Sequence, residues 1–179
     1  MTILQQDFYR ECGKKLSTLQ MLKKCIHPNL RFIFIFRKCQ ESKGLFYFFW
    51  RILLQRYQIK YGYQIYPKTQ IGAGLYLGHW GALVINPLAK IGKNCNIAQG
   101  VTIGQQNRGK KAGYPTIGNE VWIGTNAVIV GDIHIGNNVL IAPNSYVNFD
   151  VPDNSIVIGN PAQIISNDEA TKDYINNKI

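Results

Sequence analysis

The sequence of 179 residues has little cysteine and no long apolar run. The spacing of the four cysteines (Cys12, Cys25, Cys39, Cys95) fits neither a CxxC zinc or redox pattern nor a secreted disulfide framework. The longest apolar stretches, 32–36 and 45–50, are far shorter than the roughly 20 residues that cross a bilayer. The first residues also lack the basic-then-apolar order of a signal peptide. We therefore expect a cytoplasmic protein that is neither exported nor membrane-spanning.

Acidic residues are scarce as well: 10 Asp and Glu stand against 20 Lys and Arg, and the net charge is +10. Residues 1–62 hold 12 basic and 3 acidic residues, so the excess belongs to this first third. No helix-turn-helix, zinc-finger or RNP-like pattern is present, which argues against a nucleic-acid partner. Basic residues are mixed with aromatic and aliphatic ones between 43 and 62, as in a helix over about 30–60 that lies on an anionic membrane. A helix buried against its own oligomer, with solvated basic ends, is the open alternative.

An aliphatic residue recurs every six positions through the middle of the chain, and only two steps are longer. A glycine or alanine follows most of these residues, and neither a helix nor an amphipathic strand produces that period. The pattern predicts short strands joined by tight turns, three strands to a coil, with the aliphatic side chains inside. We expect the glycines to supply φ values that a Cβ would obstruct. The recurring positions are Ile65, Ile71, Leu77, Ile85, Ile91, Ile97, Ile103, Ile117, Ile123, Ile129, Ile135, Ile141 and Val147.

The period assigns each of the recurring aliphatic residues to a coil. The coils span 65–77, 85–97, 103–123 and 129–141, and a partial coil starts at Val147. Two positions after the third aliphatic of each coil come His79, Gln99, Thr125 and Pro143, which should stack about 4.8 Å apart on one outer face. Two extra residues follow His79 and widen that corner. The other long step predicts an exposed loop at 104–116, rich in glycine and lysine.

These hexads, with the closing segment VPDNSIVIGNPAQII at 151–165, resemble the hexapeptide-repeat acyltransferases. The motifs LGHWG (77–81) and VTIGQ (101–105) are similar to those of serine acetyltransferases and of surface-polysaccharide O-acetyltransferases. The resemblance implies a mainly β fold, a left-handed parallel β-helix, in a homotrimer with acetyl-CoA as co-substrate and no metal. It also implies His79 as the catalytic base. The coenzyme would lie between two subunits against Gly104, Gln105, Lys110, Lys111, Gly124, Thr125, Pro143, Asn160 and Pro161.

A single histidine suffices for this chemistry. Moving an acetyl group from a thioester to a hydroxyl requires a base, and imidazole has a pKa of about 6.5. A lone histidine usually does nothing in particular, but His79 sits at an irregularity of the repeat with Gln99 beneath it. We assign no role to His27, which precedes Pro28 in a helix-ending context, or to His134, which we expect at a turn.

The sequence departs from the serine acetyltransferase pattern where an amino acid would be recognised. Acidic positions of that family are Gln64 and Gly78 here, and its loop Arg-His-Pro reads Gly113, Tyr114, Pro115. These changes favour a saccharide acceptor in surface-polysaccharide biosynthesis, free or carried on a lipid. The contacts that we expect for it are Trp80, Gln99, Arg108 and Tyr114. Serine O-acetylation is the alternative, and a non-catalytic hexapeptide scaffold is the alternative from another class.

The sequence divides into three parts. We expect a basic, aromatic-rich helical segment at 1–62, the β-helix at 63–165 and a C-terminal tail at 166–179. The expected location is the cytoplasm, with peripheral contact at the inner face of the cell membrane if the basic segment binds lipid.

Overall fold

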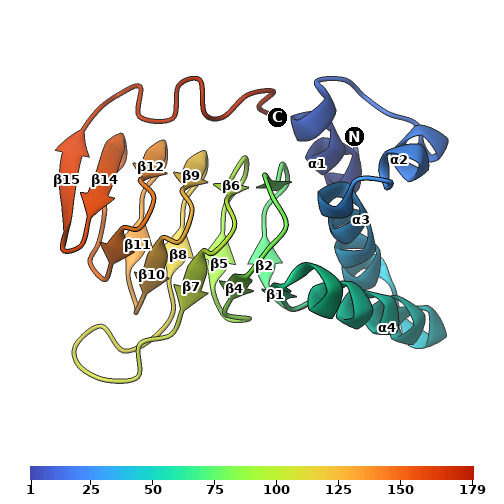
Figure 1. The fold of residues 1–179 in the computed structure, drawn as a ribbon, viewed down its shortest axis with the longest axis horizontal. Coiled ribbons are helices and arrows are strands. Elements are labelled where there is room, and N and C mark those ends of the chain that lie inside the picture. The colour runs from blue at the N-terminus through green and yellow to red at the C-terminus, as the bar shows by residue number, and fades with distance from the viewer.

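The computed structural model describes residues 1–179: four helices, and then a three-sided prism of short parallel strands (Figure 1). The helices are α1 (Ile3–Cys12), α2 (Thr18–Lys24), α3 (Pro28–Glu41) and α4 (Gly44–Tyr61). Side chains cap the first two, because Thr2 with Gln5 and Ser17 with Gln20 each form a capping box. No helix is both long and apolar enough to cross a bilayer.

Each face of the prism is one sheet. Sheet A contains β1 (Tyr63–Ile65), β4 (Leu83–Ile85), β7 (Thr102–Gly104), β10 (Val128–Val130) and β13 (Tyr146–Val147). Sheet B contains β2 (Gln70–Ile71), β5 (Lys90–Ile91), β8 (Thr116–Ile117) and β11 (His134–Ile135). Sheet C contains β3 (Tyr76–Leu77), β6 (Asn96–Ile97), β9 (Val121–Ile123), β12 (Val139–Ile141), β14 (Ser155–Gly159) and the antiparallel β15 (Ala162–Ser166).

The predicted coil assignment is confirmed residue by residue. In sheet A, Ile65 pairs with Ile85, then Ile85 with Ile103 and Ile103 with Ile129. The other two sheets stack the expected aliphatic residues in the same way. These side chains fill the prism and are buried, and each contributes roughly 1.5–3 kcal/mol of transfer free energy.

The glycines that follow the aliphatic residues are needed for a different reason from the one expected. None of them has a positive φ. A Cβ on Gly72 would instead lie 2.6 Å from the backbone of Gly92, and a Cβ on Gly118 would lie 2.6 Å from that of Gly136. Close stacking of successive coils therefore requires glycine at these positions. The left-handed turn positions are mostly asparagines, such as Asn94 and Asn138, whose short polar side chains tolerate that conformation.

The helical part also differs from the single helix expected over 30–60. Two helices occupy this region, and the helical conformation is interrupted between Glu41 and Gly44. The first of them, α3, is largely buried, whereas α4 buries only Leu54 and Tyr61 completely. The pair His27-Pro28 begins α3 rather than ending a helix, since His27 is its N-cap and Pro28 its first residue. His134 lies in strand β11 rather than at a turn.

A buried ion pair joins the helices to the first coil. Asp7 of α1 accepts a hydrogen bond from Arg37 Nε of α3 at 2.7 Å and another from the Leu75 backbone N–H at 2.9 Å. Arg37 donates further to the carbonyls of Ile71 and Gly72, at 2.9 and 2.7 Å. Burial raises the pKa of Asp7, and the Arg37 guanidinium opposes that rise. Two helices and one corner of the prism therefore depend on a single carboxylate.

Replacing this carboxylate tests the connection. Asp7→Ala leaves the Arg37 charge buried without its counter-charge, and we expect the free energy of unfolding to fall by about 3–5 kcal/mol. Glu41→Ala is the matched control, because Glu41 is exposed, its partner Lys38 is only half-buried, and such surface pairs contribute under about 1 kcal/mol. Urea denaturation followed by circular dichroism measures both. Equal, small losses in the two variants would contradict the anchoring role of Asp7.

Candidate active site

The widened corner at residues 78–82, called here the histidine corner, joins sheet C of the first coil to sheet A of the second. It has two residues more than the equivalent link from Ile97 to Val101, which the register of neighbouring strands defines. The end of α4 supports it, because Gly81 N–H donates to the Tyr61 carbonyl at 3.0 Å and Leu83 N–H to the Gly62 carbonyl at 2.9 Å. The helix end thus stands where a preceding coil would stack.

Two side chains fix the backbone of this corner. Asn29 of α3 donates from Nδ2 to the Gly78 carbonyl at 3.0 Å. The Tyr63 hydroxyl lies 3.0 Å from the His79 carbonyl and 2.8 Å from Asn29 Oδ1, and it donates to one of them at a time. Burial raises the pKa of Tyr63, so the hydroxyl keeps its proton at neutral pH. The backbone of His79 is held on its inner side, while its side chain is exposed.

His79 lines a pocket of about 230 Å³ on sheet C. Gln99 and Thr125 line it too, so three members of the predicted column meet in one place. The Gln99 Oε1 atom is buried and has no hydrogen-bond partner. A buried acceptor of this kind is costly unless a ligand or water satisfies it. The other lining residues are Tyr76, Gly78, Asn96, Ile97, Ala98 and Trp122, and none of them is charged.

The long loop does not reach this pocket. It runs from residue 105 to 115 between β7 and β8, at the corner between sheets A and B, and it projects from the prism in Figure 1. Gln106 and Gly113 pair across its base, and Lys111 Nζ lies 2.6 Å from Asp150 Oδ2. Lys111 is therefore engaged with a carboxylate instead of being free for a phosphate. Of the loop residues predicted to bind acceptor or coenzyme, Gln105, Arg108 and Lys110 are exposed and Tyr114 is half-buried.

The predicted coenzyme-binding residues fall into two groups. Gly124, Thr125, Pro143 and the Asn160-Pro161 turn follow strands of sheet C, on the side of His79. Gly104, Gln105, Lys110 and Lys111 lie at the corner between sheets A and B. A Cβ on Gly124 would lie 2.7 Å from the Pro143 nitrogen, so stacking alone explains that glycine. One prism presents the two groups on two different corners.

The predicted acceptor residues are also divided. Gln99 lines the His79 pocket, but Trp80, although next to His79 in the chain, is 59% exposed and does not line it. Sequence reasoning missed Tyr76, Asn96 and Trp122, which occupy one register row of sheet C directly before the inward aliphatic residues. The six-residue period could have predicted this row, because the three residues occupy the same position of the repeat. Nothing in the sequence pointed to Asn29 or Tyr63 as supports of the corner.

No cysteine is suited to act as a nucleophile. All four are free thiols, and burial raises the pKa of each of them, to about 11 for Cys25 and about 12 for Cys95. The thiolate form is therefore rare at neutral pH. No group of three or more His, Cys, Asp or Glu side chains is placed to hold a metal ion. Two titratable side chains line the pocket, His79 and Tyr76, and burial raises the pKa of the Tyr76 phenol, so the imidazole is the group suited to take up a proton.

Known proteins resemble this chain in both sequence and structure. The family model described as "Bacterial transferase hexapeptide (six repeats)" matches residues 114–148. A serine acetyltransferase of Helicobacter pylori is 33% identical over 144 residues, which are 80% of this chain and 84% of that protein. The serine acetyltransferase of Bacillus subtilis is 35% identical over 69% of this chain and 57% of its own length.

Solved structures agree with these sequences. The serine acetyltransferase of Neisseria gonorrhoeae superposes with a TM-score of 0.73 at 31% identity, over 92% of this chain and 66% of that one. A serine acetyltransferase of Brucella abortus, solved in complex with coenzyme A, gives 0.72 at 28% identity, over the same shares of the two chains. The Neisseria enzyme has also been solved in complex with serine. The chain thus spans about two thirds of each solved relative.

Proposed function

The chain belongs to the serine acetyltransferase family of hexapeptide-repeat acyltransferases, and from this premise we propose that it transfers an acetyl group from acetyl-CoA to the hydroxyl of serine. The observation that carries the proposal is the histidine corner: His79 is held by its backbone and opens into a pocket with an unpaired Gln99 oxygen. The names of the relatives support serine as the acceptor.

The proposed reaction uses His79 as a general base. The neutral imidazole takes the proton of the acceptor hydroxyl while its oxygen attacks the thioester carbonyl. The C–S bond then breaks, and the imidazolium returns its proton to the departing sulfur, so the base is regenerated. Gln99 Oε1 accepts hydrogen bonds only, which suits an ammonium or hydroxyl group of the acceptor. No covalent enzyme intermediate is needed.

The proposed coenzyme contacts come from both groups of residues described above. Thr125, Pro143, Asn160 and Pro161 would border the thioester arm on the side of His79. The phosphates require a cation, and the exposed Lys110 of the loop is better placed for this than Lys111, which is paired with Asp150. Acetyl-CoA would supply the activated acyl group, and the chain supplies the base and the positioning.

A saccharide is the second acceptor candidate. The uncharged residues Gln64, Gly78 and Gly113 favour it, whereas the names of the relatives support serine. One specific observation still favours it: apart from His79 itself, the pocket of His79 is lined only by uncharged residues. A zwitterionic amino acid requires partners for both of its charges, but sugar hydroxyls require only groups such as Gln99, Thr125 and Trp122.

A coupled assay tests the proposal. With acetyl-CoA fixed, free thiol should be released in a saturable manner with L-serine, and His79→Ala should reduce the rate by about 10²–10⁴-fold while the fold is retained. His134→Ala, a histidine exposed in β11, is the matched control and should keep the rate.

The outcomes separate the three candidate functions. Saturable acetyl transfer to neutral or acidic sugars, with no transfer to serine, would show that the acceptor is a saccharide and not serine. If neither serine nor any sugar causes release of free thiol from acetyl-CoA, the result would support the non-catalytic scaffold. Full activity of His79→Ala would remove this residue from the mechanism.

We also propose that the chain acts as a homotrimer. The two groups of predicted coenzyme residues lie on different corners of one prism, so a neighbouring copy must bring them together at one site. Sedimentation equilibrium should therefore give three times the 20.3 kDa chain mass, or a multiple of that. A monomer that acetylates its acceptor at full rate would overturn the shared site.

The exposed face of α4 is proposed to lie on an anionic membrane, with the enzyme on the cytoplasmic side. Leu45, Phe46, Phe48, Phe49 and Ile52 are all exposed there, at the end of α4 farther from the prism in Figure 1. Residues 42–62 hold four basic residues and no acidic one, so two copies of this face would repel each other. Anionic lipid complements both the apolar and the basic character.

Vesicle sedimentation tests this surface. The protein should bind phosphatidylserine-containing vesicles better than phosphatidylcholine vesicles, and salt should weaken the binding. Phe46→Ser with Phe49→Ser should weaken it at least about tenfold, whereas Leu19→Ser with Leu22→Ser, exposed in α2, should not. Equal binding to both vesicle types would contradict the proposal, as would a change in oligomeric state of the α4 variant without loss of vesicle binding.

A further inference from the structure

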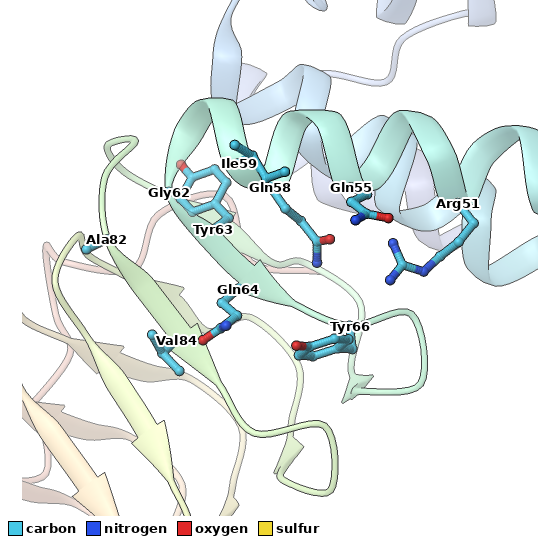
Figure 2. A pocket seen from close by; sticks show the side chains of 10 residues that line it. All are labelled: Arg51, Gln55, Gln58, Ile59, Gly62, Tyr63, Gln64, Tyr66, Ala82 and Val84. Carbon is cyan, nitrogen blue, oxygen red and sulfur yellow. The ribbon is translucent and has the colours of Figure 1, made fainter.

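A second pocket, of about 460 Å³, lies between α4 and the start of sheet A (Figure 2). Figure 2 shows Arg51, Gln55 and Gln58 reaching into it from α4, with Gln64 and Tyr66 on the opposite side. Its volume falls in the range of small-molecule sites. The remaining lining residues are Ile59, Gly62, Tyr63, Ala82 and Val84.

Arg51 is the unusual member of this set. Its Nη1 atom is buried and has no hydrogen-bond partner, and no acidic residue lines the pocket. The other basic residues of α4, Arg56 and Lys60, are exposed to solvent. An unpaired buried donor on a charged group destabilises the folded state unless something satisfies it. An anion in the pocket would do so.

The other polar groups restrict the class of anion. Gln58 donates from Nε2 to the Ile65 carbonyl at 2.7 Å, which leaves its Oε1 free to accept. The amides of Gln55 and Gln64 and the Tyr66 hydroxyl both donate and accept, so they suit hydroxyl or amine groups. A guanidinium fork matches the two oxygens of a carboxylate. The set as a whole fits a small molecule with a carboxylate next to hydroxyl groups.

We propose that this pocket binds the carboxylate of a hydroxylated acid through Arg51. This proposal rests on the proposed function in one respect: it takes the bound acid to be the acceptor of the acetyl group. Ala82 lines the pocket and belongs to the histidine corner, and Gly62, which also lines the pocket, accepts a hydrogen bond from the Leu83 N–H just after that corner. Arg51 would also supply the cation that the loop lacks at Gly113. Serine and an acidic sugar both carry the required groups.

Titration calorimetry on the full chain tests the site, with coenzyme A present. The probes are L-serine and D-glucuronate, and their counterparts without a carboxylate, L-serinamide and D-glucose, report the part of binding that needs no carboxylate. At least one acid should bind, and Arg51→Met should weaken that binding by about 10- to 100-fold without changing the binding of the matched probe that lacks the carboxylate. Arg56→Met, on the same helix but outside the pocket, is the matched control and should bind as the unaltered chain does.

A thermal unfolding experiment separates ligand binding from a structural role. Without ligand, Arg51→Met should unfold at the same or a higher temperature, because the variant removes a half-buried guanidinium whose buried Nη1 has no hydrogen-bond partner. Arg51→Lys, which keeps the charge but not the fork, should bind the acid with intermediate affinity. A lower unfolding temperature of Arg51→Met together with unchanged acid affinity would assign Arg51 to packing and overturn the proposal. Absence of binding by both acids would overturn it as well.

The pocket and the reaction can fail independently. Equal acetylation and binding of serine by the unaltered chain and by Arg51→Met would refute the pocket and leave the proposed function intact. Binding of serine that depends on Arg51 but leads to no acetyl transfer would keep the pocket and refute the function. Binding of glucuronate alone would keep the pocket and identify the acid as a sugar.

Discussion

Close stacking of one coil on the next is the constraint on which the rest of this structure depends. Parallel strands lie about 4.8 Å apart, and the backbone reaches that spacing at the corner between sheets B and C because Gly72, Gly92, Gly118 and Gly136 carry no Cβ. Once the coils stack in register, each position of the repeat forms a straight row along the prism. His79, Gln99 and Thr125 share a pocket because they occupy the same position in successive coils.

Because the fold depends on this stacking, much of it could be predicted from the sequence. A period of six allows one phase, since a shift of one residue would turn every aliphatic side chain outward. The pairing of Ile65, Ile85 and Ile103 and the position of the long loop therefore followed from spacing alone. The role of the glycines did not, because a sequence does not reveal whether glycine serves a turn or a close contact.

Contacts between the helices and the prism were inaccessible for a physical reason. Asn29 and Tyr63 reach the histidine corner from segments 49 and 16 residues away in the chain, and no repeat relates them to it. The break between α3 and α4 and the pocket at Arg51 likewise depend on how two helices pack. The sequence shows where the chain departs from the serine acetyltransferase pattern, at Gln64 and Gly113, but the pocket in which we propose that Arg51 binds the acceptor lies outside the repeat.

The last residues of the chain alter how the prism holds together. After β15 the chain turns back and runs along the prism to α1 (Figure 1). It bonds to Asn138, then to Asn96 through the Tyr174 carbonyl, and finally to the Arg10 carbonyl through Asn177. In a solenoid each coil contacts only its neighbours, so its two ends can fray separately. This returning strap joins the last coil to the first helix, and it makes fraying at one end costly at the other. The helices and the prism should accordingly unfold as one cooperative unit.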